Sequence, residues 1–269
     1  MTLENGLNVA LAPRDTKNFA AQLRIYHGAA HERLEEEGLA HFLEHIIWGV
    51  GGEGITQDEA NYLRTSAGYS NAVTNMATTT YQFSDMGDRL DDALRLFKGS
   101  VFRPHVDAKV LEQERKRVLR ELADIRHDAN YQGGKILLQL TKNQEDPCRN
   151  RDVGGKKEIV ASANRDQLLH FHERGYGARN ALLVIAGAIP SNIEDIINNK
   201  FSDLPSGLGA PYIFPNPQFP TKPEWHELET GQAASKAPTE ESSAALDLFL
   251  SAPALKMIDD FQLISLILY

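Results

Sequence analysis

The sequence predicts an α+β fold, because strand-like and helix-like segments both recur along its 269 residues. Short runs rich in β-branched and other apolar residues are typical of strands, whereas apolar residues three or four positions apart are typical of helices. The composition, 42% hydrophobic and 24% charged, is that of an ordinary globular protein. A chain of this length can bury a proper core, either as one large domain or as two small ones.

Strands are expected where apolar runs of four to eight residues lie between turn-forming residues. Pro13-Arg14-Asp15 provides the turn between the first two, and the third and fourth are close enough to form a hairpin. In chain order the predicted strands are Leu7–Leu11, Phe19–Tyr26, Ser70–Thr74, Thr78–Phe83 and Ala181–Ala186.

Helices are expected where the apolar spacing follows the helical period. The glycine-rich run Gly49–Gly54 ends the first helix. Thr56, followed three residues later by Glu59, resembles an N-cap that opens the second. The predicted helices cover residues 38–48, 56–67, 88–102, 107–128, 134–141, 156–161, 165–173 and 193–201.

The segment Pro205–Ser243 differs from the rest, since it holds seven of the twelve prolines and has poor periodicity. We expect one domain over residues 1–204, a Pro-rich linker over 205–243 and the truncated start of a second domain over 244–269. In that last part Ala245–Phe249 resembles a strand and Met257–Leu268 a helix that runs on to the chain end without a stop signal. The polypeptide is therefore expected to be a piece of something larger.

Charge and composition exclude several functions. A net charge of −9 argues against nucleic-acid binding. No apolar run approaches membrane-spanning length, and no signal-peptide core precedes the first predicted strand, so we expect a soluble protein without membrane partners. Cys148 is the only cysteine, which rules out an intrachain disulfide and a thiolate zinc cluster. These features leave the compartment open.

The motif His41-Phe42-Leu43-Glu44-His45 carries the clearest chemical signal. On a helix His41 and His45 lie one turn apart on the same side, so both imidazoles can reach one metal ion. Glu44 lies on the adjoining strip, where its carboxylate can reach a water held by that ion. The residue order H-x-x-E-H is the inverted-zincin signature. The alternative is an ordinary amphipathic helix whose histidines have no ligand.

A third ligand is expected from elsewhere, because two histidines leave a tetrahedral metal under-coordinated. The long helix predicted at residues 107–128 offers Glu112, Glu114 and Glu121, of which the last two share one face. These glutamates could equally belong to a solvated helix with internal ion pairs, such as Glu112 with Lys116.

Several ordered blocks give the chain a resemblance to the N-terminal portion of the pitrilysin/insulinase family of zinc metallopeptidases, which also contains the mitochondrial processing peptidase. The resemblance covers nearly all of residues 1–202. It rests on Leu3–Leu7, Gly28–Glu32, Gly38–His45, Asn71–Thr74 with Thr79 and Tyr81, Glu114-Arg115 with Val118–Glu121, and Tyr176, Asn180 and Leu182–Gly187.

The resemblance implies a mixed, mostly antiparallel sheet with helices mainly on one face. It implies one Zn²⁺ per chain, bound by His41, His45 and Glu121, with Glu44 as general base. Glu114 matches a second acidic position, suited to orienting a ligand histidine. An extended substrate would lie along the strand that contains Asn71, Ala72, Val73 and Thr74.

The implied function is zinc-dependent endoproteolysis of peptides or unfolded segments, in a chamber closed by a second homologous half or subunit. The turn Trp48–Gly52 departs from the family pattern, which leaves substrate preference open. Two alternatives remain. The chain could be a non-catalytic subunit that uses the same fold, or its substrate could be one specific precursor peptide, as for the pyrroloquinoline-quinone-pathway members of the family.

Overall fold

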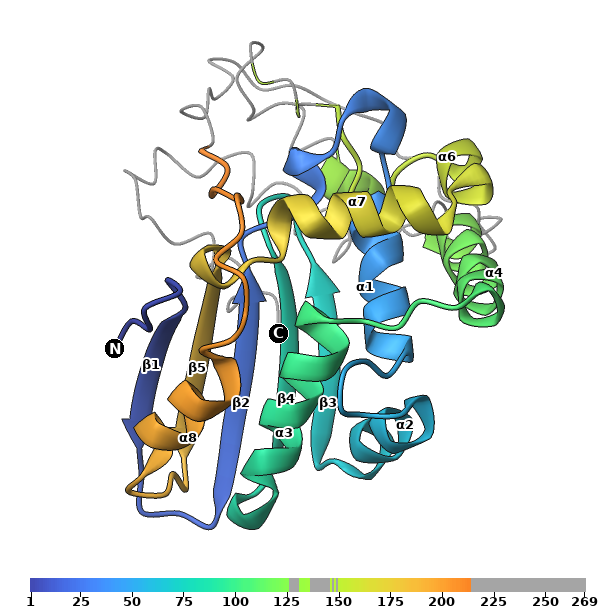
Figure 1. The fold of residues 1–269 in the computed structure, drawn as a ribbon. Coiled ribbons are helices and arrows are strands. Elements are labelled where there is room, and N and C mark those ends of the chain that lie inside the picture. The colour runs from blue at the N-terminus through green and yellow to red at the C-terminus, as the bar shows by residue number, and fades with distance from the viewer. Residues whose placement is uncertain (126–130, 136–145, 147, 149, 214–269) are drawn as a thin grey trace, which may run out of the picture. The chain divides into compact units, whose positions relative to one another are not determined.

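A computed structural model describes residues 1–125, 131–135, 146, 148 and 150–213 (Figure 1). Its described strands form one five-stranded sheet in the order β1-β5-β2-β4-β3. β1 runs parallel to β5, and the remaining pairs are antiparallel. The strands are β1 Asn8–Pro13, β2 Asn18–Ile25, β3 Tyr69–Thr74, β4 Thr79–Met86 and β5 Ala181–Gly187. The prediction of a mixed, mostly antiparallel sheet is therefore confirmed.

The helices lie close to the predicted segments, and the segment at residues 88–102 divides into an α-helix and a π-helical turn, η4, at Phe97–Phe102. They are α1 Leu39–Gly49, α2 Gln57–Ser66, α3 Leu90–Leu96, α4 Ala108–Ile125, α6 Lys157–Ser162, α7 Arg165–Gly175 and α8 Ile193–Phe201. Short 3₁₀ turns that the periodicity did not predict occur at η1 Ala29–His31, η2 Leu34–Glu36, η3 Gly87–Arg89 and η5 Ala178–Asn180.

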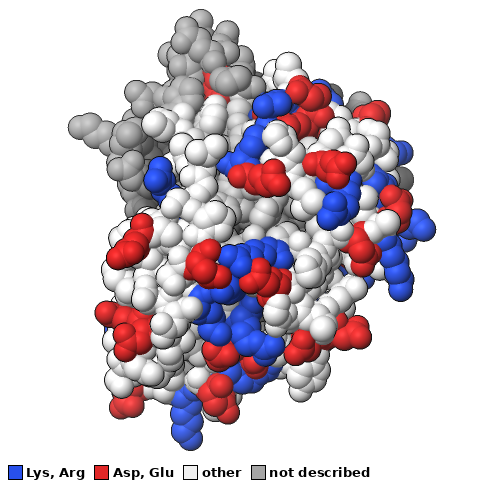
Figure 2. Space-filling model, viewed as in Figure 1, with Lys and Arg blue, Asp and Glu red and all other residues white. Residues whose placement is uncertain are grey.

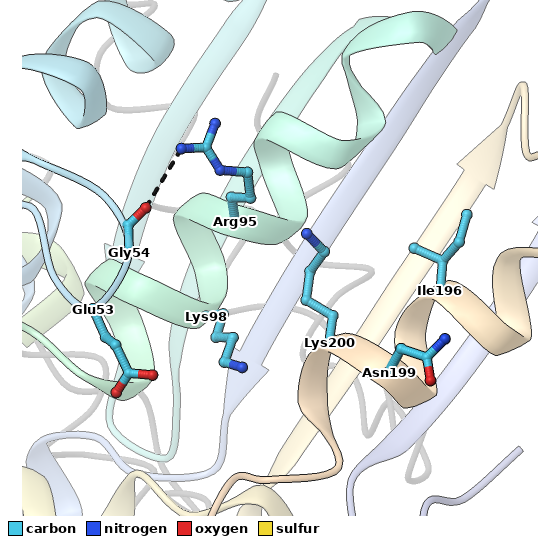
Figure 3. Close-up of a pocket in the computed structure, with 7 residues that line it drawn as sticks. All are labelled: Glu53, Gly54, Arg95, Lys98, Ile196, Asn199 and Lys200. Atoms are coloured by element: carbon cyan, nitrogen blue, oxygen red, sulfur yellow. Dashed lines mark hydrogen bonds between the residues drawn. The ribbon is translucent and has the colours of Figure 1, made fainter.

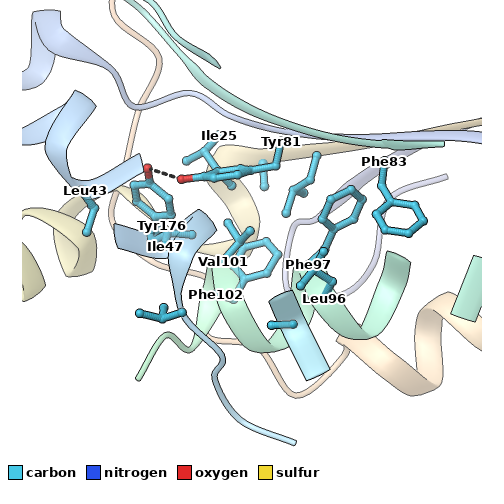
Figure 4. Close-up of a cluster of buried hydrophobic side chains, with 14 of the residues drawn as sticks. Ile25, Leu43, Ile47, Tyr81, Phe83, Leu96, Phe97, Val101, Phe102 and Tyr176 are labelled. Atoms are coloured by element: carbon cyan, nitrogen blue, oxygen red, sulfur yellow. Dashed lines mark hydrogen bonds between the residues drawn. The ribbon is translucent and has the colours of Figure 1, made fainter. Parts of the chain in front are cut away.

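One face of the sheet forms the core. In β2 the side chains of Phe19, Ala21, Leu23 and Ile25 are buried, and those between them are more exposed. This alternation places every second residue against the helices. Figure 1 shows α3 and α8 across this face, and Figure 4 shows aromatic and aliphatic side chains pointing from the strands toward the helices. Burying each large apolar side chain contributes about 2 kcal/mol.

The start of α1 is fixed by a buried carboxylate. Glu32 Oε1 accepts hydrogen bonds from the backbone N–H groups of Gly38 (3.1 Å) and Ala40 (2.8 Å). These donors have no partner within the helix, so the carboxylate satisfies them. Burial raises the pKa of Glu32 to about 8, against the lowering effect of both hydrogen bonds. Gly38 has a φ of +105°, which favours glycine, and a Cβ there would lie 2.9 Å from Gly154 O.

A second compact unit comprises His127–Lys142 and Pro217–Tyr269, of which residues 131–135 are described and helical. Most of the helix predicted at 134–141, most of the linker predicted at 205–243 and all of the domain predicted at 244–269 lie outside the described residues. Within the described part of the chain, no helix is both long enough and apolar enough to cross a membrane.

Two histidines are buried without charge in the core. His172 Nε2 lies 2.8 Å from Val101 O, and burial lowers the pKa of His172 to about 4. His27 packs against Gly175, where a Cβ would lie 2.0 Å from the imidazole. Burial, followed by the nearby His31, lowers the pKa of His27 to about 3. Both side chains bind a proton more readily in the unfolded chain.

The free energy of unfolding should therefore fall as the pH is lowered from about 6.5 to about 4, because the unfolded state takes up more protons over this range. Each histidine contributes at most about 1.4 kcal/mol per pH unit. Replacing His172 by Gln, which keeps an N–H donor, should make this pH dependence less steep in urea unfolding experiments. His170→Gln, an exposed change on the same helix, is the control. Equal slopes for the two variants would contradict the assignment.

Candidate metal centre

Two imidazoles of α1 meet on the side of the helix that faces α4. His41 Nε2 and His45 Nε2 are 3.1 Å apart, and their rings are nearly perpendicular, with centroids 4.7 Å apart. The opposite strips of α1 are packed in the core, where Ala40, Phe42, Leu43, Ile46 and Ile47 have no exposed surface. The helix is thus held so that both histidines lie on its partly exposed side.

The third group comes from α4. One carboxylate oxygen of Glu121 lies 3.6 Å from His41 Nε2, and the other lies 3.2 Å from His45 Nε2. Tetrahedral zinc with bonds of 2.0–2.1 Å separates its ligand atoms by about 3.3 Å. The three side chains therefore fit one such ion, and they are the group of potential metal ligands found within the described residues.

The pKa values of His41, His45 and Glu121 are shifted by burial and by one another. Burial, followed by the neighbouring His45, lowers the pKa of His41 to about 4, so its lone pair is available at neutral pH. Burial also acts to lower the pKa of His45, but the nearby carboxylates of Glu114 and Glu121 outweigh it and raise that pKa to about 9. The interaction between His45 and Glu121 lowers the pKa of the Glu121 carboxyl. At neutral pH His45 is therefore the protonated histidine of the pair, and it faces the Glu121 carboxylate.

Glu114 lies behind His45. Its Oε2 is 3.7 Å from His45 Nδ1, and its side chain is buried, with Arg117 Nη1 3.1 Å from Oε1. A carboxylate on the second ring nitrogen orients a ligating histidine. His41 lacks such a partner, because its buried Nδ1 has no hydrogen bond among the described residues. Of the three glutamates considered on this helix, Glu112 points away and pairs with Arg115.

Glu44 lies on α1 beside the two histidines and is buried. Burial raises the pKa of this carboxyl, and hydrogen bonds from Thr74 act in the opposite direction. The Thr74 hydroxyl donates to Glu44 Oε2 at 2.8 Å. A carboxylate held in this way, next to a candidate metal site, is suited to accept a proton.

The strand predicted to hold substrate, β3, is at the edge of the sheet and pairs only with β4 among the described strands. Asn71 and Val73 are exposed, Ala72 is half-buried and Thr74 is buried. The structure therefore separates Thr74 from the other three. Alternation along a strand already places Thr74 on the opposite face from Asn71 and Val73, so this part of the distinction could have been predicted from the sequence.

A shallow cavity of about 520 Å³ lies elsewhere, between α3 and α8, and is lined by Arg95, Lys98 and Lys200, with Glu53, Gly54, Ile196 and Asn199 (Figure 3). Figure 2 shows Lys and Arg side chains gathered on this face with Asp and Glu beside them. Lys98 pairs with Asp203 at 2.9 Å, and Lys200 pairs with Asp91 at 2.8 Å. Because these charges are already balanced, the cavity is a weaker candidate site than the histidine cluster.

Comparison with known proteins relates this chain to peptidases. The sequence matches the family Insulinase (Peptidase family M16) over residues 8–143, and the Peptidase M16 inactive domain over residues 162–266. It is 30% identical over 218 residues to the insulin-degrading enzyme of Drosophila melanogaster, covering 76% of this chain and 21% of that protein. It is 28% identical over 204 residues to the chloroplastic stromal processing peptidase of Pisum sativum, covering 73% of this chain and 16% of that protein.

The fold is also similar to a solved structure, the first half of the periplasmic protease PqqL from Escherichia coli. The TM-score is 0.69 at 23% sequence identity, and the match covers 83% of this chain and 49% of that one. In the two sequence comparisons described above, the chain spans about a fifth of the length of each relative. Since the first family match alone covers half of the sequence and includes the whole histidine–glutamate cluster, the chain belongs to the insulinase family of peptidases, family M16.

Proposed function

We propose that this chain forms the metal-binding part of a zinc-dependent endopeptidase. The main support is the convergence of His41, His45 and Glu121. The two imidazole nitrogens are 3.1 Å apart, and each lies within 3.6 Å of a Glu121 carboxylate oxygen, close to the roughly 3.3 Å between the ligand atoms of tetrahedral zinc. A fourth group, the Glu44 carboxylate, lies beside them and is held by a hydrogen bond. All four residues fall within the segment that matches the insulinase family, and outside the match to the domain described as inactive.

In this proposal His41, His45 and Glu121 hold the metal, and Glu114 fixes the ring of His45. Zinc, when bound, supplies a Lewis acid that polarises a carbonyl oxygen and makes water a better nucleophile at neutral pH. Glu44 then accepts a proton from the attacking water and passes it to the departing amine. Its partial burial favours this exchange, because a raised pKa brings a carboxylate closer to the working pH.

The proposed substrate is a peptide or an unfolded polypeptide segment in extended form. The edge of β3 that has no partner among the described strands offers backbone N–H and C=O groups to such a chain, and Asn71, Ala72 and Val73 lie along it. Strand addition of this kind satisfies the substrate backbone irrespective of its sequence, so side-chain pockets would set selectivity.

A second homologous half or subunit is proposed to close the chamber around the substrate. Support comes from the length of the relatives, which are several times longer than this chain. A linker at residues 205–243 and a second domain beginning at 244 stay predictions of the sequence, and they fit the same arrangement.

Two alternatives are less well supported. A non-catalytic subunit would gain nothing from burying the carboxylates of Glu44 and Glu114 beside two histidines, because buried charges destabilise a fold unless they are well paired. A single precursor peptide as substrate is compatible with the geometry, and a digestion profile over mixed peptides would distinguish it from general proteolysis.

The metal site is tested by zinc titration. The parent chain should bind about one zinc ion, and Glu121→Gln should weaken the zinc affinity more than about 10-fold, because it removes one of three ligands. Glu112→Gln, an exposed change on the same helix, should bind zinc like the parent. Equal zinc affinity in all three proteins, measured by competition with a chromogenic chelator, would disprove the three-residue site.

The role of Glu44 is tested by Glu44→Gln, which keeps the shape of the side chain but cannot accept the proton. We expect zinc binding to be retained and the rate of peptide hydrolysis to fall by at least about 100-fold. The assay uses a quenched fluorescent peptide and the native protein, with the partner that completes the chamber present. A variant that cleaves the peptide at the parental rate would reject Glu44 as the base.

A further inference from the structure

The hydrogen bond between Thr74 and Glu44 joins the edge strand to the helix that carries the candidate metal centre. The donor is the last residue of β3, the acceptor lies on α1, and the two are 30 residues apart in sequence. Both side chains are buried, with 8% of each residue exposed. A buried carboxylate with a single strong side-chain donor adopts the orientation which that donor dictates.

The position of Thr74 is fixed by the turn that follows it. Asn75 N–H donates to Thr78 O at 2.7 Å and closes the hairpin. The carbonyl groups of Asn75 and Met76 accept from Ala29 N–H (3.1 Å) and Ala30 N–H (2.7 Å). A Cβ at the neighbouring Gly28 would lie 2.3 Å from Asn75 O, so the close approach depends on this glycine. The hairpin end is thus fastened to the segment that leads into α1.

The position of Glu44 is fixed independently. The N-terminus of α1 is held by Glu32, and the residues on either side of Glu44 that enter the core, Leu43 and Ile46, are fully buried. Donor and acceptor are therefore each anchored by contacts that do not involve the other. The fold sets the 2.8 Å separation before any substrate binds. A polar group that is already oriented need not be rearranged during the reaction, and this lowers the reaction barrier.

The geometry points to Thr74 as a positioning residue that orients the Glu44 carboxylate and couples it to β3. The inference rests on the proposed peptidase function and extends it, since the strand offered to the substrate also holds the proton acceptor. The edge of β3 that has no described partner would position the peptide, and Thr74 on the same strand orients the Glu44 carboxylate. One strand would thus set the position of the peptide relative to the proton acceptor.

The experiment compares Thr74→Val, which replaces the hydroxyl by a methyl group, with Thr74→Ser, which keeps the hydroxyl. Thr79→Val is the matched control. Thr79 pairs with Thr74 across the hairpin and is also buried, but its hydroxyl donates to His27 O at 2.9 Å. Each protein is assayed for kcat and KM on a quenched fluorescent peptide, with the partner that completes the chamber present, and for zinc affinity and thermal stability. Crystal structures of the zinc-free forms locate the Glu44 carboxylate.

We expect Thr74→Val to lower kcat by about 10- to 100-fold, the worth of a hydrogen bond to a charged group. KM and zinc affinity should change less than about twofold, and the Glu44 carboxylate should move in the crystal. Thr74→Ser should restore both kcat and the carboxylate position, and Thr79→Val should keep kcat despite a similar loss of stability.

The inference is overturned by an unmoved carboxylate in Thr74→Val, or by equal losses of kcat in Thr74→Val and Thr79→Val. A parent protein that binds zinc but cleaves no peptide would reject the peptidase proposal instead, and the carboxylate position in the crystals would still decide whether Thr74 orients Glu44.

Discussion

The burial of α1 is the constraint on which the rest of this structure depends. The helix is packed between the sheet, α4 and α7, and most of its circumference has no contact with solvent. A helix enclosed in this way cannot rotate about its axis without opening cavities in the core. The direction of His41, Glu44 and His45 is therefore decided by apolar packing, although none of the three is apolar.

Negative charge is concentrated around that helix. Glu44, Glu114 and Glu121 approach the same two histidines, and two of these carboxylates are buried. Isolated charges are costly in such surroundings. The raised pKa of His45 lets its imidazolium balance part of this negative charge. Under the proposed function, zinc binding would release that proton, because a ligating histidine must be neutral.

The sequence predicted the local elements well because each has its own period and end signals, such as Thr56 at the start of α2. Helical spacing also predicted that His41 and His45 converge. It could not choose among Glu112, Glu114 and Glu121, because that choice depends on how α4 packs against α1; the family resemblance pointed to Glu121. Nor could it show that β5 inserts between β1 and β2, since strand order is set by contacts between residues far apart in the chain. Thr74 was assigned to substrate contact, and only the packed hairpin shows its side chain turned toward Glu44.

The place of β5 in the sheet has a consequence for biosynthesis. β1 and β2 are neighbours in sequence, but β5, which ends at Gly187, lies between them and pairs with both. While a ribosome is still making the chain, these two early strands have no complete partner until that late segment emerges. The helix with both histidines leaves the ribosome long before the sheet beneath it can close. The sheet that supports this helix is therefore completed only after most of this region has been translated.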